Sequence, residues 1–124
     1  MLKNRLFHQS YLGLKARSDV IAHDWPQFRG INRDGISPEK GLLQEWPQQG
    51  PKLIWKTKED LGEGHSSAAV ANKRIFTTGM IKGEGVLFAF NLRGELLWKQ
   101  NYGPEWKNAW PGSRSTPTVK GEKI

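Results

Sequence analysis

The stretch SSAAVANKRIFTTGMIKGEGVLFAFNLRGELLWKQ, residues 66–100, decides the fold class of this 124-residue chain. It is built from short runs rich in β-branched and aromatic residues, and residue pairs typical of tight turns separate the runs. Asn72-Lys73 and Arg93-Gly94 are two such pairs. The runs predict four strands, at residues 66–71, 74–79, 85–90 and 95–100. Short strands linked by hairpins indicate an antiparallel, all-β fold.

A repeated Trp-Lys dipeptide predicts the architecture. Trp55-Lys56 recurs as Trp98-Lys99, 43 residues further along the chain. The segment AVANKRI at 69–75 is matched by TVKGEKI at 118–124, 49 residues further along. A period in the forties with four short strands per unit is typical of a β-propeller blade. The sequence therefore predicts a partial β-propeller.

This partial propeller has three predicted components. Four strands within residues 66–100 form one complete blade, a strand at 53–56 ends the blade before it, and a strand at 116–119 begins the next. A blade buries its two faces only against neighbouring blades. We therefore expect residues 23–124 to be the N-terminal part of a truncated propeller repeat domain that needs further downstream blades for closure. Residues 1–22 are expected to form a disordered leader.

Three stretches resemble one known family, the pyrroloquinoline-quinone-like (PQQ-like) β-propeller repeat proteins. DWPQFRG at 24–30 with NRDG at 32–35, and KLIWK at 52–56, resemble the opening and the first blade-closing strand of a bacterial secreted branch. LFAFNLRGELLW at 87–98 resembles the tryptophan-docking repeat, whose usual form is Ala-x-Asp-x-x-Thr-Gly-x-x-x-Trp. The family includes the lipoprotein of the outer-membrane β-barrel assembly machinery. The resemblance covers about residues 24–124.

The repeat positions of that family fall on five residues of this chain: Trp55, Ala89, Asn91, Gly94 and Trp98. Asn91 stands where the family has Asp, and the turn before Gly94 is one residue shorter and lacks the Thr. Ala89 is small enough for a ring such as that of Trp98 to stack over its strand. Gly94 permits the positive φ that the hairpin between them requires.

Composition excludes several classes of protein. The chain has no Cys, which removes disulfides, thiolate metal sites and cysteine nucleophiles. The longest apolar run, residues 86–90, is far too short for a transmembrane helix. The formal net charge is +7, but acidic residues are interleaved with the 19 Lys and Arg, whereas a nucleic-acid surface requires clustered cations. We predict no nucleic-acid partner and no transmembrane segment.

No motif for catalysis, a cofactor or a metal stands out. His65 and Ser66 are sequence neighbours at the start of a predicted strand. Neighbours in extended chain point to opposite faces, and no Gly-x-Ser-x-Gly elbow surrounds this pair. Gly62-Glu63-Gly64 lacks the third glycine and the helix of a dinucleotide site. Asn32-Arg33-Asp34-Gly35 lacks the alternating oxygen ligands of a calcium loop. We therefore predict no catalytic, cofactor-binding or metal-binding residue, and neither PQQ nor calcium as a ligand.

Trp106 and Trp110 are the candidates for an exposed binding surface, because they lie four residues apart in a loop that also contains Pro111 and Gly112. Their rings either stack on a sugar or a protein partner, or fill the central channel or a gap between blades.

Two functions are compatible with the resemblance. The favoured one is a non-catalytic scaffold that binds protein or polysaccharide in the periplasm or cell envelope. The alternative is the N-terminal part of a quinoprotein alcohol dehydrogenase, whose calcium and catalytic base would come from other blades. Envelope location is implied by the resemblance alone, because residues 1–22 lack the uninterrupted apolar core of a secretory signal.

Overall fold

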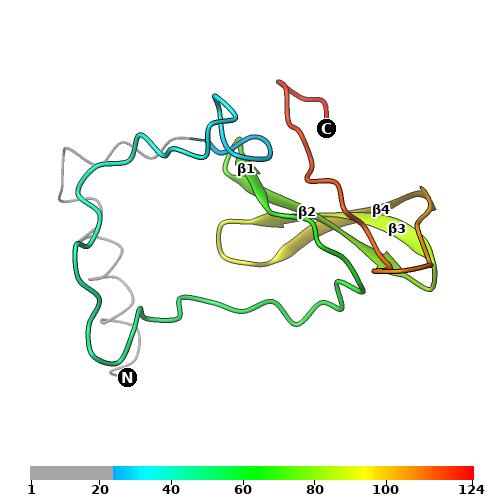
Figure 1. Ribbon diagram of the computed structural model, residues 1–124, viewed down its shortest axis with the longest axis horizontal. Helices are drawn as coiled ribbons and strands as arrows, with labels where there is room; N and C mark the ends of the chain where they lie inside the picture. Colours follow the sequence, from blue (N-terminus) through cyan, green and yellow to red (C-terminus); the bar gives the residue numbers. More distant parts are fainter. Residues whose placement is uncertain (1–23) are drawn as a thin grey trace. The chain divides into compact units, whose positions relative to one another are not determined.

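The computed structural model describes residues 24–124, and its regular structure is a single antiparallel sheet (Figure 1). The strands are β1 (Ala69–Ala71), β2 (Arg74–Ile81), β3 (Glu84–Asn91) and β4 (Leu96–Pro104). They pair in chain order, β1-β2-β3-β4, and the described part of the chain contains no helix. The predicted all-β, hairpin-connected fold is confirmed for this region. The leader expected at residues 1–22 lies outside the described residues.

Two of the three turns are tight two-residue hairpins. Asn72 and Lys73 have φ of 53° and 59°, and Lys82 and Gly83 have φ of 53° and 85°. Positive φ at both central residues is the mark of a type I′ turn, whose twist matches that of the strands it joins. The first of these turns was predicted from the sequence. The second was not, and strands β2 and β3 are correspondingly longer than expected.

The third turn, between β3 and β4, is organised by the side chain of Asn91. Its Oδ1 accepts hydrogen bonds from the backbone N–H groups of Arg93 at 2.9 Å and Glu95 at 3.1 Å. Gly94 completes the turn with a φ of 78°. An aspartate at this position would offer the same acceptor oxygen. The Asn91 amide also donates to Glu95 at 2.5 Å, and this bond, with the Arg93 charge, lowers the pKa of Glu95.

One face of the sheet carries a row of residues that runs straight across all four strands. Ala69 pairs with Phe76, Phe76 with Ala89, and Ala89 with Trp98. Small and large side chains alternate along this row, and its first three members are no more than 2% exposed. Leu87 and Val119 pack against them. Val119 thus closes this face from a segment far along the chain.

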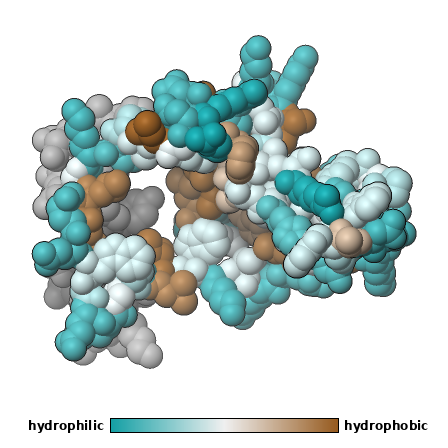
Figure 2. Space-filling model, viewed as in Figure 1, coloured by the Kyte–Doolittle hydropathy of each residue, from teal (hydrophilic) through white to brown (hydrophobic). Residues whose placement is uncertain are grey.

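The opposite face is centred on Val86, Phe88 and Phe90, all of them buried. Leu61 packs on this cluster, together with Ile75, Ile81 and Leu96 of the strands. From residue 55 to residue 61 the burial alternates, with odd-numbered residues half-buried and even-numbered ones exposed. Such alternation is typical of an extended segment, and Leu61 at its end packs on the second face. In Figure 2 the surface over the strands that faces the viewer is mainly hydrophilic or intermediate.

The predictions of strands at residues 53–56 and 116–119 were wrong. Neither segment forms a strand. Trp55 is held by its side chain instead of by a backbone ladder, and Leu53 and Ile54 before it are 73% and 68% exposed. The 116–119 segment lies over a face of the sheet rather than along an edge, and its Val119 N–H bonds to Pro26 O at 2.8 Å. Both runs have strand-like composition, but a segment forms a strand only where its backbone pairs with the edge strand of a sheet.

Short bridges continue the β1 side of the sheet. Trp25 and Val70 exchange two backbone hydrogen bonds, and so do Glu63 and Met80. Gly79 makes the second bridge feasible, because a Cβ there would lie 1.7 Å from the carbonyl oxygen of Leu61. Residues 37–51 form part of a separate compact unit and have no regular structure. Their large apolar side chains, Leu42, Leu43 and Trp46, are exposed.

Candidate binding surface

The loop that contains Trp106 and Trp110 is fixed to the sheet at both ends. Where it leaves β4, the N–H of Glu105 donates to the carbonyl of Gly83 at 3.1 Å. Where it returns, the carbonyl of Ser113 accepts from the N–H of His65 at 2.7 Å. The loop therefore begins next to the β2–β3 turn, to which it is bonded, and it ends beside the Glu63–Met80 bridge.

Ser113 anchors the returning end through a chain of hydroxyl groups. It is completely buried, and its Oγ lies 2.6 Å from Thr78 Oγ1 and 2.9 Å from the Tyr102 hydroxyl. Thr78 donates its own proton to the carbonyl of Ser115 at 2.9 Å, and Tyr102 donates to Glu105. Burial raises the pKa of Tyr102, and its hydrogen bond to Glu105 raises it further. The network ties β2, β4 and the loop together.

Gly112 allows the loop to approach the Glu63–Gly64 segment closely. Its φ is 105°, and a Cβ at this position would lie 2.5 Å from both the carbonyl carbon and the oxygen of Glu63. Any side chain would therefore force the loop away from the sheet.

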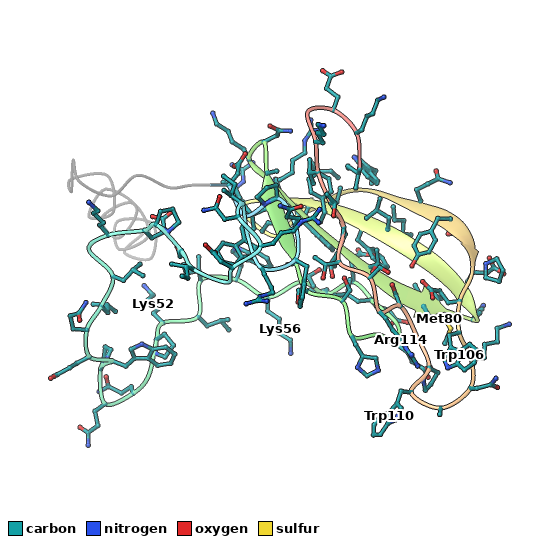
Figure 3. The ribbon with its side chains drawn as sticks, turned by 45° about the horizontal axis from the view of Figure 1, so that its top comes forward. Lys52, Lys56, Met80, Trp106, Trp110 and Arg114 are labelled. Atoms are coloured by element: carbon teal, nitrogen blue, oxygen red, sulfur yellow. The ribbon has the colours of Figure 1, made fainter. Side chains whose placement is uncertain are left out.

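Arg114 holds the outer part of the loop. Its guanidinium donates to the carbonyls of Ala109 at 2.9 Å and Trp110 at 3.1 Å, and it lies 5.8 Å from the centre of the Trp106 ring. The Trp106 indole N–H also donates to Ala109 O, at 2.9 Å. Figure 3 shows Trp106, Trp110 and Arg114 together at one end of the sheet, near Met80. A cation over an indole face adds to the polar contacts that define this loop.

The two tryptophans are displayed outward. Trp106 is 51% exposed and Trp110 is 76% exposed. Trp110 also has a φ of 58°, in the left-handed region that a bulky residue rarely adopts. Backbone strain of this kind persists only where surrounding contacts impose it, and it is concentrated at functional sites. Chemically, the loop offers aromatic faces for stacking beside a guanidinium.

The residues of the tryptophan-docking pattern come together elsewhere, at the other end of β4. The Trp55 indole N–H donates to Leu92 O at 3.0 Å, and its ring lies against Gly94, where a Cβ would be 2.4 Å away. Asn91 shapes the same turn, and Ala89 pairs with Trp98 on the adjacent strands. The five residues therefore occupy one hairpin and the segment packed on its turn.

Sequence reasoning missed the residues that hold the candidate surface in place. These residues are Thr78 of β2, Tyr102 of β4, and Ser113 and Arg114 of the loop. Some of their contacts join residues up to 37 positions apart in the sequence, where no periodic pattern links them. Pro111 and Gly112 indicated a loop without indicating what the loop packs against. Only Trp106 and Trp110 were singled out, because they lie four residues apart in a loop that contains glycine and proline.

Acidic and histidine side chains are dispersed over the described residues, where no group of three or more could hold a metal ion. A pocket of about 260 Å³ lies beside the hydroxyl network and is bordered by Tyr102, Glu105 and Pro117. Over residues 24–124 there is no helix suited to crossing a membrane. Comparisons with protein-family models, with curated proteins and with solved structures gave no match.

Proposed function

We propose that this chain is a non-catalytic PQQ-like β-propeller repeat protein that acts as a binding or assembly scaffold in the cell envelope. In this proposal the sheet β1–β4 is one blade. The loop around Trp106 and Trp110 is the surface that meets a protein or polysaccharide partner. The tryptophans at the other end of the sheet are structural.

The observation that carries the proposal is the docking of Trp55 on the turn at Gly94. The sequence around Trp55, LIWK at 53–56, is repeated almost unchanged as LLWK at 96–99 in β4. Trp98 is 38% exposed although it lies in a sheet. Because Trp98 occupies the position of Trp55 in the repeated sequence, its exposed ring is expected to dock on the turn of a further blade. Repeated docking of this kind is how solenoid and propeller units bury their faces.

The loop around Trp106 and Trp110 is proposed as the contact surface because several contacts and a strained backbone hold its indole rings exposed. A buried serine, an arginine with three contacts and a strained Trp110 all serve to hold two indole rings in solvent. Exposed tryptophan beside arginine is the side-chain chemistry most enriched at the energetic centres of interfaces.

The proposal is tested by cell fractionation and ligand titration. We expect the protein to be recovered with the envelope and to show no calorimetric binding of PQQ or calcium. The matched variant Trp110→Ala, which leaves the contacts of Trp106 in place, should fold normally but be released from the envelope fraction. Exclusively cytoplasmic recovery of the wild-type protein contradicts the scaffold. Stoichiometric micromolar binding of PQQ supports the quinoprotein dehydrogenase instead.

A further inference from the structure

We propose that the occupant of the surface formed by Trp106, Lys107, Trp110 and Arg114 is an acidic polysaccharide. The sugar rings stack on the two indoles, and the carboxylates of uronic acid residues meet the two cations. This inference rests on the proposed function, since it names the partner of the same surface.

The two indole rings of the surface suit a partner with flat rings, which can stack on their exposed faces. Trp110 is 76% exposed, and the Trp106 indole N–H is already engaged by Ala109 O. The rings therefore present their faces more than their hydrogen-bonding edges. The contacts of Arg114 with the Ala109 and Trp110 carbonyls fix the loop before any ligand arrives. A preorganised surface loses less conformational entropy when it binds.

The charges of the loop favour an anionic partner. Residues 105–114 contain two cations and one carboxylate, Glu105; the cations are Arg114 and Lys107, whose ammonium group lies against Gly83 of the β2–β3 turn. That carboxylate accepts a hydrogen bond from Tyr102. The whole chain has a formal net charge of +7, which draws a polyanion toward it over longer distances. The two loop carbonyls are bonded by Nη2 of Arg114, which leaves the Nε and Nη1 donors of the guanidinium, and a carboxylate is a stronger acceptor for a charged donor than the hydroxyl of a neutral sugar.

Nearby acidic residues limit this attraction and provide an internal control. Glu63 is one of them, because it lies on the segment whose backbone packs against Gly112 of the loop. Replacing it with glutamine removes that charge and keeps the shape. Lys56 provides the matched cation control, because it is exposed and Figure 3 shows it far from Trp110 and Arg114.

The experiment measures binding of polygalacturonate by the full chain, with neutral dextran and poly-glutamate as comparison polymers. We expect polygalacturonate to bind best, with affinity that falls as salt rises. Trp110→Ala and Lys107→Gln should each weaken it by about tenfold, a loss of about 1.4 kcal/mol. Glu63→Gln should strengthen binding, and Lys56→Gln should leave it unchanged. Circular dichroism and the urea midpoint establish that each variant is folded.

Three results overturn the inference. Equal binding of dextran shows that the anionic groups are irrelevant. Equal binding of poly-glutamate, unaffected by Trp110→Ala, shows simple ion exchange. If polygalacturonate does not bind but Trp110→Ala still leaves the envelope fraction, the partner is a protein, and the proposed scaffold stands without this inference.

Discussion

Phe76 and Trp98 make contact although their strands are not neighbours in the sheet. Their ring centres lie 6.1 Å apart with planes inclined at 48°, and the strand between them contributes only Ala89 to the row that joins them. The small methyl group leaves room for two large rings to meet above β3. This contact links β2 to the edge strand β4, and it contributes beyond the area that the rings bury.

Enlarging Ala89 should therefore separate the two rings. We expect Ala89→Leu to destabilise the fold by about 1–3 kcal/mol, the usual cost of overpacking a filled site. Urea unfolding followed by tryptophan fluorescence measures this loss. Ala68→Leu is the control, because Ala68 is exposed and should tolerate the larger side chain. Equal midpoints for Ala89→Leu and the wild type contradict the packing described for this row.

Gly94 and Trp55 should show strong energetic coupling. Alanine at 94 must adopt a φ of 78° and also meets the Trp55 ring at 2.4 Å. We expect Gly94→Ala to cost about 2–3 kcal/mol in the wild type, since both strain and steric overlap contribute. After Trp55→Ala only the backbone strain remains, and the cost of the same substitution should fall to about 1 kcal/mol.

A double-mutant cycle by urea denaturation measures this coupling, with Gly50→Ala as the control. Gly50 also has positive φ, at 77°, but no atom lies within 4 Å of its added Cβ, so its cost should not depend on Trp55. Additive effects of Gly94→Ala and Trp55→Ala show that the indole does not dock on this turn in solution.

These examples also show how far the sequence could predict the fold. The four strand-forming runs within residues 66–100, the Asn72-Lys73 turn and the glycine at 94 are local signals, and each identified its element correctly. Whether residues 53–56 and 116–119 join a sheet depends on a partner edge, which no local signal describes. The side-chain network of Thr78, Tyr102 and Ser113 joins residues distant in the sequence, and single hydroxyl groups carry no detectable pattern.

Stability should decline at alkaline pH because of Tyr102. Burial first, and then the hydrogen bond to Glu105, raise the pKa of this phenol above its ordinary value of 10.0. The folded state therefore favours the protonated form. The resulting stabilisation is complete below pH 10, and it is lost as the pH rises through the folded-state pKa.

Tyr102→Phe is the matched variant, since it keeps the ring and removes the titrating group. At pH 8 it should cost about 1 kcal/mol for the lost hydrogen bonds. As the pH rises past the ordinary tyrosine pKa of 10.0 and through the raised pKa of the folded state, wild-type stability should approach that of the variant. Parallel stability curves for the two proteins over this range rule out a role for Tyr102 ionisation.

Trp110 should contribute to binding at the expense of stability. Its φ of 58° disfavours any residue with a bulky side chain, and 76% of its surface is exposed, so the ring gains little from packing within the chain. We expect Trp110→Gly to raise the free energy of unfolding by up to about 1 kcal/mol, because glycine adopts left-handed φ without strain. The same variant should lose affinity for the partner of the loop.

Trp106→Gly provides the contrast. It removes the ring under Arg114 and the hydrogen bond to Ala109 O, and Trp106 has no positive φ that glycine could relieve. It should therefore destabilise the fold. Urea midpoints of the two variants, measured beside their binding, separate the cases. If Trp110→Gly is less stable than the wild type, the indole packs within the fold and is not held out for a partner.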